Sequence, residues 1–110
     1  MGENSASEIF YDRKGCRISC EQWERLIHDT EYRRIEFDQF DDFFIYTSWI
    51  GIDQGELDDP VIFMTYMGPL VGPAVCFYYS QEKMARKHHN MFTFMADQNC
   101  LHKFLEEKFL

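Results

Sequence analysis

The chain lacks cationic side chains over almost half of its length. Of its 110 residues 11 are lysine or arginine, and none of these lies in residues 35–82. The same stretch carries nine of the 19 acidic residues, and the whole chain has a net charge of −8. Proteins that bind nucleic acid or anionic lipid need a basic footprint. The composition therefore argues against direct binding of DNA or RNA and against binding to a membrane surface.

Long apolar runs and an export signal are also missing. The longest apolar stretches reach about ten residues, half of what a bilayer-spanning helix requires. Residues 1–7 are polar and lack the apolar segment of a secretory signal. Four cysteines are too few for a secreted disulfide scaffold. We therefore expect reduced thiols and a cytoplasmic location.

Aromatic residues are abundant where cations are absent. Hydrophobic residues make up 45% of the chain, and it contains 11 phenylalanines, six tyrosines and two tryptophans. This is enough apolar surface for a folded core in one domain of this size. We expect residues 1–7 to be disordered and residues 8–110 to form a single domain.

Local patterns predict the elements of that domain. Two short strands around Gly15 form a hairpin, and Ser19 with Gln22 has the spacing of a capping box at the start of a helix that ends near Asp29. Alternating or apolar segments then predict four strands. These are residues 34–40, 43–52, 61–67 and 74–79.

A second long helix follows the last predicted strand. Ser80 is the expected N-cap, and five side chains at helical spacing form an apolar stripe, namely Met84, His88, Met91, Phe92 and Met95. The order β-β-α-β-β-β-β-α with short connections predicts an α+β fold. We expect an antiparallel sheet of about four to six strands with helices packed on it.

The predicted strands 43–52 and 61–67 are apolar on both sides. A helical layer covers only one face of a sheet, so the aromatics of the other face need a second cover. Either the first helix supplies it, or that face is an interface with a second copy or with another protein.

Four segments in order carry a family resemblance. They contain Tyr11 and Gly15; Trp49, Gly51 and Asp53; Pro60 and Phe63; and Tyr79, Ser80, Ala85 and His89. Over residues 9–95 this pattern resembles a family of small uncharacterised proteins from bacteriophage and actinobacterial genomes. Met64 stands where that family usually has an acidic residue, and His88 stands in place of a glycine. The resemblance implies origin and architecture, with no activity attached.

Acidic and aromatic residues of the middle region are the candidate partner-binding residues. They are Asp38, Asp41, Asp42, Tyr46, Trp49, Asp53, Glu56, Asp58 and Asp59. Carboxylates of this kind steer a protein toward a basic surface in a salt-dependent manner. The leading hypothesis is a non-enzymatic interaction protein of phage or mobile-element origin. It would act in the host cytoplasm on a basic protein partner, for example as an inhibitor of a nucleic-acid enzyme or a defence system.

Two alternatives stay open. The first is a small enzyme or ligand-binding domain in which His89 acts with Asp53 or Tyr66, since a paired imidazole and carboxylate can transfer protons. The second is a structural homodimer.

No cofactor and no metal are expected. A zinc site would need Cys16 and Cys20 together with two further ligands, and no second ligand pair is spaced for it.

Overall fold

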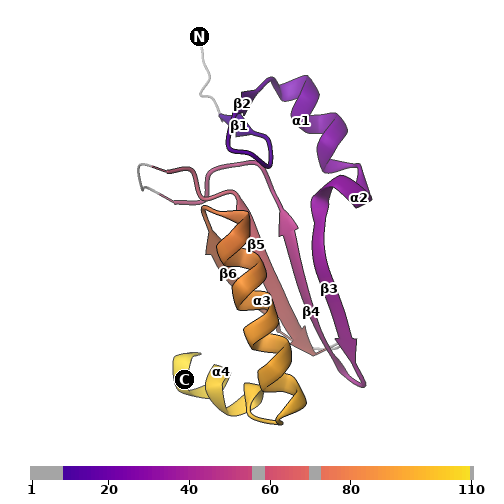
Figure 1. The fold of residues 1–110 in the computed structure, drawn as a ribbon, viewed down its shortest axis with the longest axis vertical. Coiled ribbons are helices and arrows are strands. Elements are labelled where there is room, and N and C mark those ends of the chain that lie inside the picture. The colour runs from indigo at the N-terminus through magenta and orange to yellow at the C-terminus, as the bar shows by residue number, and fades with distance from the viewer. Residues whose placement is uncertain (1–8, 56–58, 70–72, 110) are drawn as a thin grey trace.

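The computed structural model describes residues 9–55, 59–69 and 73–109, and these form an α+β domain with two antiparallel sheets (Figure 1). In chain order the elements are β1 (Phe10–Tyr11), β2 (Arg17–Ile18), α1 (Cys20–Ile27), α2 (Thr30–Arg33), β3 (Arg34–Phe40), β4 (Phe43–Trp49), β5 (Phe63–Pro69), β6 (Val75–Tyr79), α3 (Glu82–Asp97) and α4 (Leu101–Phe109). The predicted fold class and element order are confirmed, with α2 as an additional short helix. The predicted disorder of residues 1–7 lies outside the described residues.

The main sheet is a meander in which each strand pairs antiparallel with the next, in the order β3-β4-β5-β6. Asp41 and Asp42 join β3 to β4 in a two-residue turn between the paired residues Phe40 and Phe43. Short connections of this kind are what the sequence pattern predicted.

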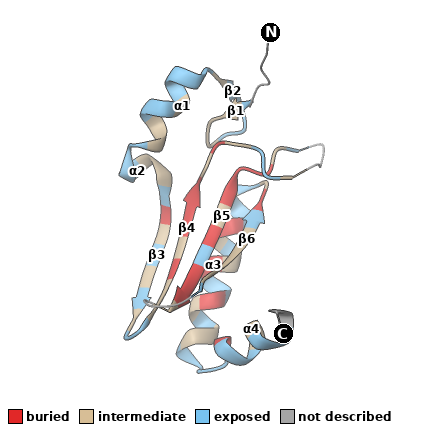
Figure 2. Cartoon of the chain, turned by 180° about the vertical axis from the view of Figure 1, so that it is seen from behind, coloured by how far each residue is buried: buried red, intermediate tan, exposed pale blue. Residues whose placement is uncertain are grey.

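Helix α3 lies lengthwise across one face of this sheet and contacts all four strands (Figure 1). Seen from behind, the opposite face carries no helix of the described chain, and α1 and α2 lie beyond one end of the strands (Figure 2). Among the described residues the first helix therefore does not cover the second face, so one of the two covers considered from the sequence is absent. We call the side under α3 the covered face and the other side the open face.

The core lies between α3 and the covered face. One cluster of buried side chains fills the end near the N-terminal hairpin, and a second fills the end near α4. The first contains Ile35, Trp49, Ile62, Phe63, Tyr79 and Ala85, and the second Ile45, Met67, Phe92 and Leu101. Each cluster joins residues from the sheet to residues from a helix, so the two layers fold as one unit.

The N-terminal hairpin and α1 pack against the end of β4. The capping box of Ser19 and Gln22 forms as predicted. The Trp23 indole donates a hydrogen bond of 2.9 Å to the carbonyl of Ile50. Gly51 has a φ of +74°, and a Cβ there would lie 2.5 Å from Trp49 and 2.7 Å from Trp23. Only glycine fits this turn between the two indoles.

Three local predictions need correction. The strand predicted over 43–52 ends at Trp49, and the strand predicted over 61–67 runs from Phe63 to Pro69. The N-cap of α3 is Gln81, without a capping bond from its side chain, and not Ser80.

The apolar stripe predicted on α3 is confirmed for Phe92 and Met95 and is one position off at the other residues. Ala85, His89 and Phe92 are the buried residues of the helix, whereas Met84 and Met91 are exposed. The prediction placed Met84 and His88 inward, where the structure has Ala85 and His89. In the structure a small residue lets the helix approach the sheet, and hydrogen bonds satisfy the imidazole.

No described helix is both long enough and apolar enough to cross a membrane.

Candidate functional site

The open face is the most unusual surface of the molecule. Alternate residues of a strand point to opposite faces, and Ile45, Thr47 and Trp49 of β4 are fully buried under α3. The intervening side chains and their cross-strand partners therefore lie on the open face (Figure 2). The large ones are Phe37, Phe44, Tyr46, Met64, Tyr66 and Tyr78.

Rings on the open face contact one another across the strands. Phe37, Tyr46 and Tyr66 lie side by side in register on three neighbouring strands. The ring centroids of Phe37 and Tyr46 are 5.9 Å apart, and those of Phe44 and Tyr66 are 5.4 Å apart. Phe37, Tyr66 and Tyr78 are 44%, 39% and 47% exposed. This is a contiguous patch of aromatic surface rather than scattered single side chains.

Apart from Arg34 at its border, the open face carries no charged side chain on the described strands. The carboxylates of Glu36 and Asp38 point to the covered face, where they meet α3. At one border the guanidinium of Arg34 lies 5.7 Å from the centre of the Phe37 ring. Burial, with smaller contributions from the charge and hydrogen bond of Cys76, raises the pKa of Tyr78, so its phenol is neutral.

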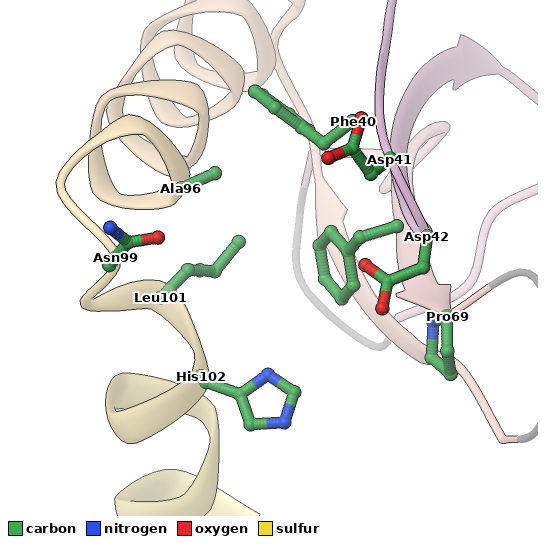
Figure 3. Close-up of a pocket in the computed structure, with 9 residues that line it drawn as sticks. Phe40, Asp41, Asp42, Pro69, Ala96, Asn99, Leu101 and His102 are labelled. Atoms are coloured by element: carbon green, nitrogen blue, oxygen red, sulfur yellow. The ribbon is translucent and has the colours of Figure 1, made fainter.

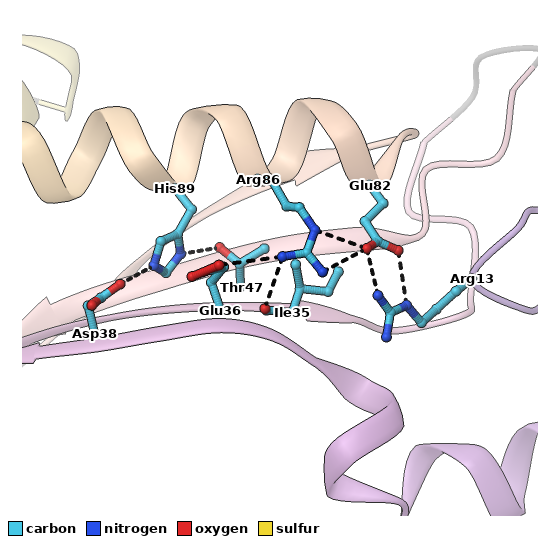
Figure 4. Close-up of polar contacts among 8 residues, drawn as sticks. All are labelled: Arg13, Ile35, Glu36, Asp38, Thr47, Glu82, Arg86 and His89. Carbon is cyan, nitrogen blue, oxygen red and sulfur yellow. Dashed lines mark hydrogen bonds and ion pairs between the residues drawn. The ribbon is translucent and has the colours of Figure 1, made fainter.

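A buried polar chain crosses the covered face. His89 on α3 is fully buried, and its Nδ1 lies 2.7 Å from Oγ1 of Thr47 (Figure 4). That hydroxyl lies 2.7 Å from Oγ1 of Thr65 on the next strand. On its other side, Nε2 of His89 lies 2.7 Å from Oδ2 of Asp38. Both ring nitrogens therefore have partners, as a buried imidazole requires.

The chain of hydroxyls continues to the far strand. The pKa of Tyr79 is raised to about 12, chiefly by burial, while a hydrogen bond from Thr65 lowers it. Its phenol oxygen lies 3.1 Å from Nδ1 of His88. Side chains on all four strands of the main sheet and on α3 thus form one connected network from Asp38 to His88.

An ion-pair network lies beside this chain and links the N-terminal hairpin to α3. Arg13 donates to both carboxylate oxygens of Glu82, at 3.0 and 2.6 Å, and Arg86 donates to Oε2 at 3.1 Å (Figure 4). Partial burial alone would raise the pKa of Glu82, but the hydrogen bonds and charges of Arg13 and then Arg86 outweigh it and lower the pKa. This carboxylate stabilises the fold in its ionised form.

A hollow of about 390 Å³ lies between the turn joining β3 to β4 and the junction of α3 with α4 (Figure 3). Asp41 and Asp42 line it together with Phe40, Leu101 and His102. Here two of the predicted partner-binding acids share a concavity with apolar side chains.

The structure does not bring the predicted acidic residues together in one patch. Asp41 and Asp42 are at one end of the sheet, whereas Asp53 and Asp59 are in the loop at the opposite end (Figure 1). The Oδ1 atom of Asp53 accepts hydrogen bonds from the amides of Gly55 and Val61, so this side chain holds its own loop. Glu56 and Asp58 lie outside the described residues.

Two further predictions about the site are wrong in geometry. Trp49 is fully buried, and its indole nitrogen donates to the carbonyl of Tyr11 at 3.1 Å, so it presents no surface to a partner. His89 does not meet Asp53 or Tyr66. It is paired with Asp38 and Thr47, and Tyr66 lies on the opposite face of the sheet.

The sequence analysis missed most of the open face. Of its large side chains only Tyr46 and Tyr66 were candidates, while Phe37, Phe44 and Tyr78 were not. These residues can be identified from strand alternation once the position of α3 is known. Because Thr47 is buried under α3, its neighbour Tyr46 and the residues paired with Tyr46 on the adjacent strands must lie on the opposite face.

Comparison with protein-family models, with curated proteins and with solved structures finds no match for this chain. The resemblance to phage and actinobacterial proteins therefore stays a prediction, and the functional argument depends on the surfaces described above.

Proposed function

We propose that this protein is a small acidic interaction module that binds a protein partner through the open face. The observation that carries the proposal is the contiguous patch of Phe37, Phe44, Tyr46, Tyr66 and Tyr78 on a sheet face without a covering helix. Aromatic side chains dominate the buried centres of protein interfaces because they bring large contact area at small entropic cost.

The charge of the molecule indicates the chemistry of the partner. The net charge is −8, and residues 35–82, which include the whole main sheet except Arg34 at the start of β3, contain no lysine or arginine. Exposed Asp41 and Asp42 at one end of the sheet and Asp59 at the other flank the neutral aromatic centre. The complementary surface is apolar at its centre with lysine and arginine around it. Proteins that hold nucleic acid have such surfaces, which favours an inhibitor of that class of protein.

The same charges disfavour a second copy of the chain as the occupant. Two copies that met through their open faces would bring two net charges of −8 together. Such repulsion is screened only partly at physiological ionic strength. A homodimer is therefore an outcome that the experiment must detect, and a foreign basic partner is the proposal.

The enzyme hypothesis required His89 to lie beside Asp53 or Tyr66, and the structure separates these residues. His89 is buried among Asp38, Thr47 and helix α3, while Asp53 and Tyr66 are elsewhere. The imidazole is satisfied as part of the core.

The test uses the full chain as bait in a host lysate, with a control variant that removes an exposed ring from another surface. The triple variant Phe37→Ser, Tyr66→Ser and Tyr78→Ser removes the exposed rings of the open face, and Phe94→Ser removes a ring that is 63% exposed on α3. Circular dichroism first establishes that each variant is folded. We expect one protein to be retained by the wild type and by Phe94→Ser, and retained at least ~10-fold less by the triple variant.

Two further measurements identify the chemistry of that protein. Raising the salt from ~0.05 M to ~0.5 M releases a partner that is held by charge complementarity. Added double-stranded DNA competes with the module if the partner's basic surface is the docking site. Equal capture by the wild type and the triple variant contradicts the proposal. So does sedimentation showing a stable wild-type dimer that the triple variant dissociates, since a second copy is then the occupant.

A further inference from the structure

Three metal-ligating side chains converge where β3 meets α3. Glu36 and Asp38 are alternate residues of an edge strand, so both carboxylates point to the covered face. His89 reaches the same place from the buried side of the helix (Figure 4). One carboxylate oxygen of each acid and a ring nitrogen of the histidine all lie within 4.8 Å of one another.

We propose that Glu36, Asp38 and His89 form a binding site for one divalent transition-metal ion of the zinc class. An imidazole with two carboxylates suits such ions, whereas calcium and magnesium prefer ligand sets made only of oxygen. Metal-ligand bonds of about 2.0–2.1 Å place tetrahedral ligand atoms about 3.3 Å apart. The Nε2 atom of His89 is 2.7 Å from Oδ2 of Asp38, so a movement of less than ~1 Å opens room for the ion.

The two carboxylates are free to make that adjustment. The side chains of Asp38 and Glu36 are 47% and 37% exposed, while His89 is fully buried and fixed. The ion would enter from solvent on the carboxylate side. Three protein ligands leave the fourth position to water, as in open zinc sites.

The surroundings of His89 are those of a metal ligand. Histidine ligands usually donate a hydrogen bond from the second ring nitrogen, which fixes the ring and its tautomer. Here Nδ1 faces Thr47 Oγ1, and Thr47 faces Thr65. When Nε2 binds the ion, its proton leaves to solvent and Nδ1 takes one up, so that the imidazole stays neutral and Nδ1–H donates to Thr47. Each hydroxyl then donates one step onward, through Thr65 and Tyr79 to Nδ1 of His88. No member of the chain is left unpaired.

Arg86 is the competitor for Glu36. Its Nη1 lies 3.4 Å from Oε1 of Glu36, which is a long contact. The same guanidinium holds Glu82 through Nε at 3.1 Å and Nη2 at 3.0 Å. Glu36 can therefore turn to the ion while Arg86 keeps its closer carboxylate.

The sequence analysis expected no metal because it weighed the cysteines as ligands. The site assembled by the fold uses none of them, and it joins residues 51 positions apart. An ion at this place would join the edge strand β3 to α3, and it would stabilise the folded chain in proportion to its occupancy. The inference does not depend on the proposed function, since the open face is on the other side of the sheet.

The test is zinc titration of the full chain in a background that removes adventitious thiol ligands. Cys16, Cys20 and Cys100 are exposed and would bind zinc by themselves. The background protein therefore carries serine at these three positions. Isothermal titration calorimetry with zinc chloride, and cobalt(II) absorption in the visible range, measure stoichiometry and ligand type. We expect one equivalent bound without a thiolate band, and a rise in the melting temperature with zinc.

Two surface variants locate the site without disturbing the buried imidazole. Asp38→Asn and Glu36→Gln in the same background should each weaken zinc binding at least ~10-fold. Asp41→Asn, a carboxylate at the turn just beyond the same strand, should leave it unchanged. If Asp38→Asn fails to fold, Glu36→Gln alone decides. A background protein that binds no equivalent of zinc overturns the proposal, and so does unchanged affinity in the folded variants.

Discussion

The two faces of the main sheet are similar in composition and opposite in burial. On the covered face Ile45, Thr47 and Trp49 are fully buried, and its threonines are hydrogen bonded to a buried imidazole. On the open face the neighbouring rings of Phe37 and Tyr66 keep 44% and 39% of their surface exposed. An apolar side chain at a strand position thus does not reveal whether it serves folding or binding. Whether such a side chain is buried or exposed depends on which face α3 covers.

The acidic residues show the same division. Glu36, Asp38 and Glu82 on the side of α3 each contact a guanidinium or an imidazole. Asp41 and Asp42 protrude at the turn, where they line an open hollow. The carboxylates of Glu36, Asp38 and Glu82 therefore join α3 to the sheet and to the N-terminal hairpin. Those of Asp41 and Asp42 remain exposed, where a partner could contact them.

The largest effect is expected in the core of the covered face. Phe92 on α3 is 1% exposed, and Phe92→Ala should lower the free energy of unfolding by ~3–5 kcal/mol because it leaves a cavity between the helix and the sheet. Phe94→Ala, two residues later at 63% exposure, should change it by less than ~0.5 kcal/mol. Urea denaturation followed by circular dichroism measures both. Similar losses for the two variants would show that α3 is not docked as described.

The buried polar chain should be the next most sensitive feature. Thr47→Val keeps the side-chain shape but leaves His89 and Thr65 without their shared hydroxyl, and we expect a loss of ~2–3 kcal/mol. Thr93→Val removes a hydroxyl that bonds the carbonyl of Asn90 in an exposed setting, and should cost less than ~0.5 kcal/mol. The same denaturation experiment compares the two threonines. A near-neutral Thr47→Val would mean that the chain of hydroxyls does not hold the covered face.

The ion pair that joins the hairpin to α3 should produce a pH-dependent effect. The pKa of Glu82 is lowered from its ordinary value of 4.5, so its contribution is fully present above that value and is lost as the pH falls through the lower folded pKa. Arg13→Ala should therefore cost ~1–2 kcal/mol at neutral pH. The cost should shrink as the solution is acidified through and below pH 4.5, toward the remainder that the contacts of Arg13 with Tyr32 contribute.

Denaturation at a series of pH values measures this convergence. Lys14→Ala removes the adjacent, exposed cation and is the control, whose stability curve should run parallel to that of the wild type. A constant difference between Arg13→Ala and the wild type at every pH would assign the loss to packing of the arginine rather than to the ionised carboxylate.

Features set by neighbouring residues were predictable from the sequence. The capping box of Ser19 and Gln22 and the bounds of β3, Arg34–Phe40, agree with the structure because hydrogen bonds over three residues and strand alternation determine them. The antiparallel order of the sheet followed from short connections.

Features that depend on how α3 docks were not predictable. A shift of one helical position turned Ala85 and His89 inward in place of Met84 and His88. It also made Asp38, 51 residues away, the partner of His89. Trp49 was a candidate for binding because local sequence does not reveal that Tyr11 and Tyr32 enclose its ring. The candidate site therefore had to come from the tertiary arrangement.

The smallest energetic effect is expected for the ring contacts of the open face. Measuring it is the most direct comparison of the open face with the covered face. A double-mutant cycle with Phe37→Leu and Tyr46→Leu should give a coupling energy of only ~0.5 kcal/mol, since the two rings, 5.9 Å apart, meet at a partly hydrated surface. The rings of partly buried Phe77 and fully buried Phe92, 5.2 Å apart, are the comparison pair on the covered face and should couple more strongly. Equal coupling would place the open face within the folding core and remove the physical reason for assigning its aromatics to a partner. A weak coupling energy would show that folding does not require the contact between these rings, as the proposal of a bound partner expects.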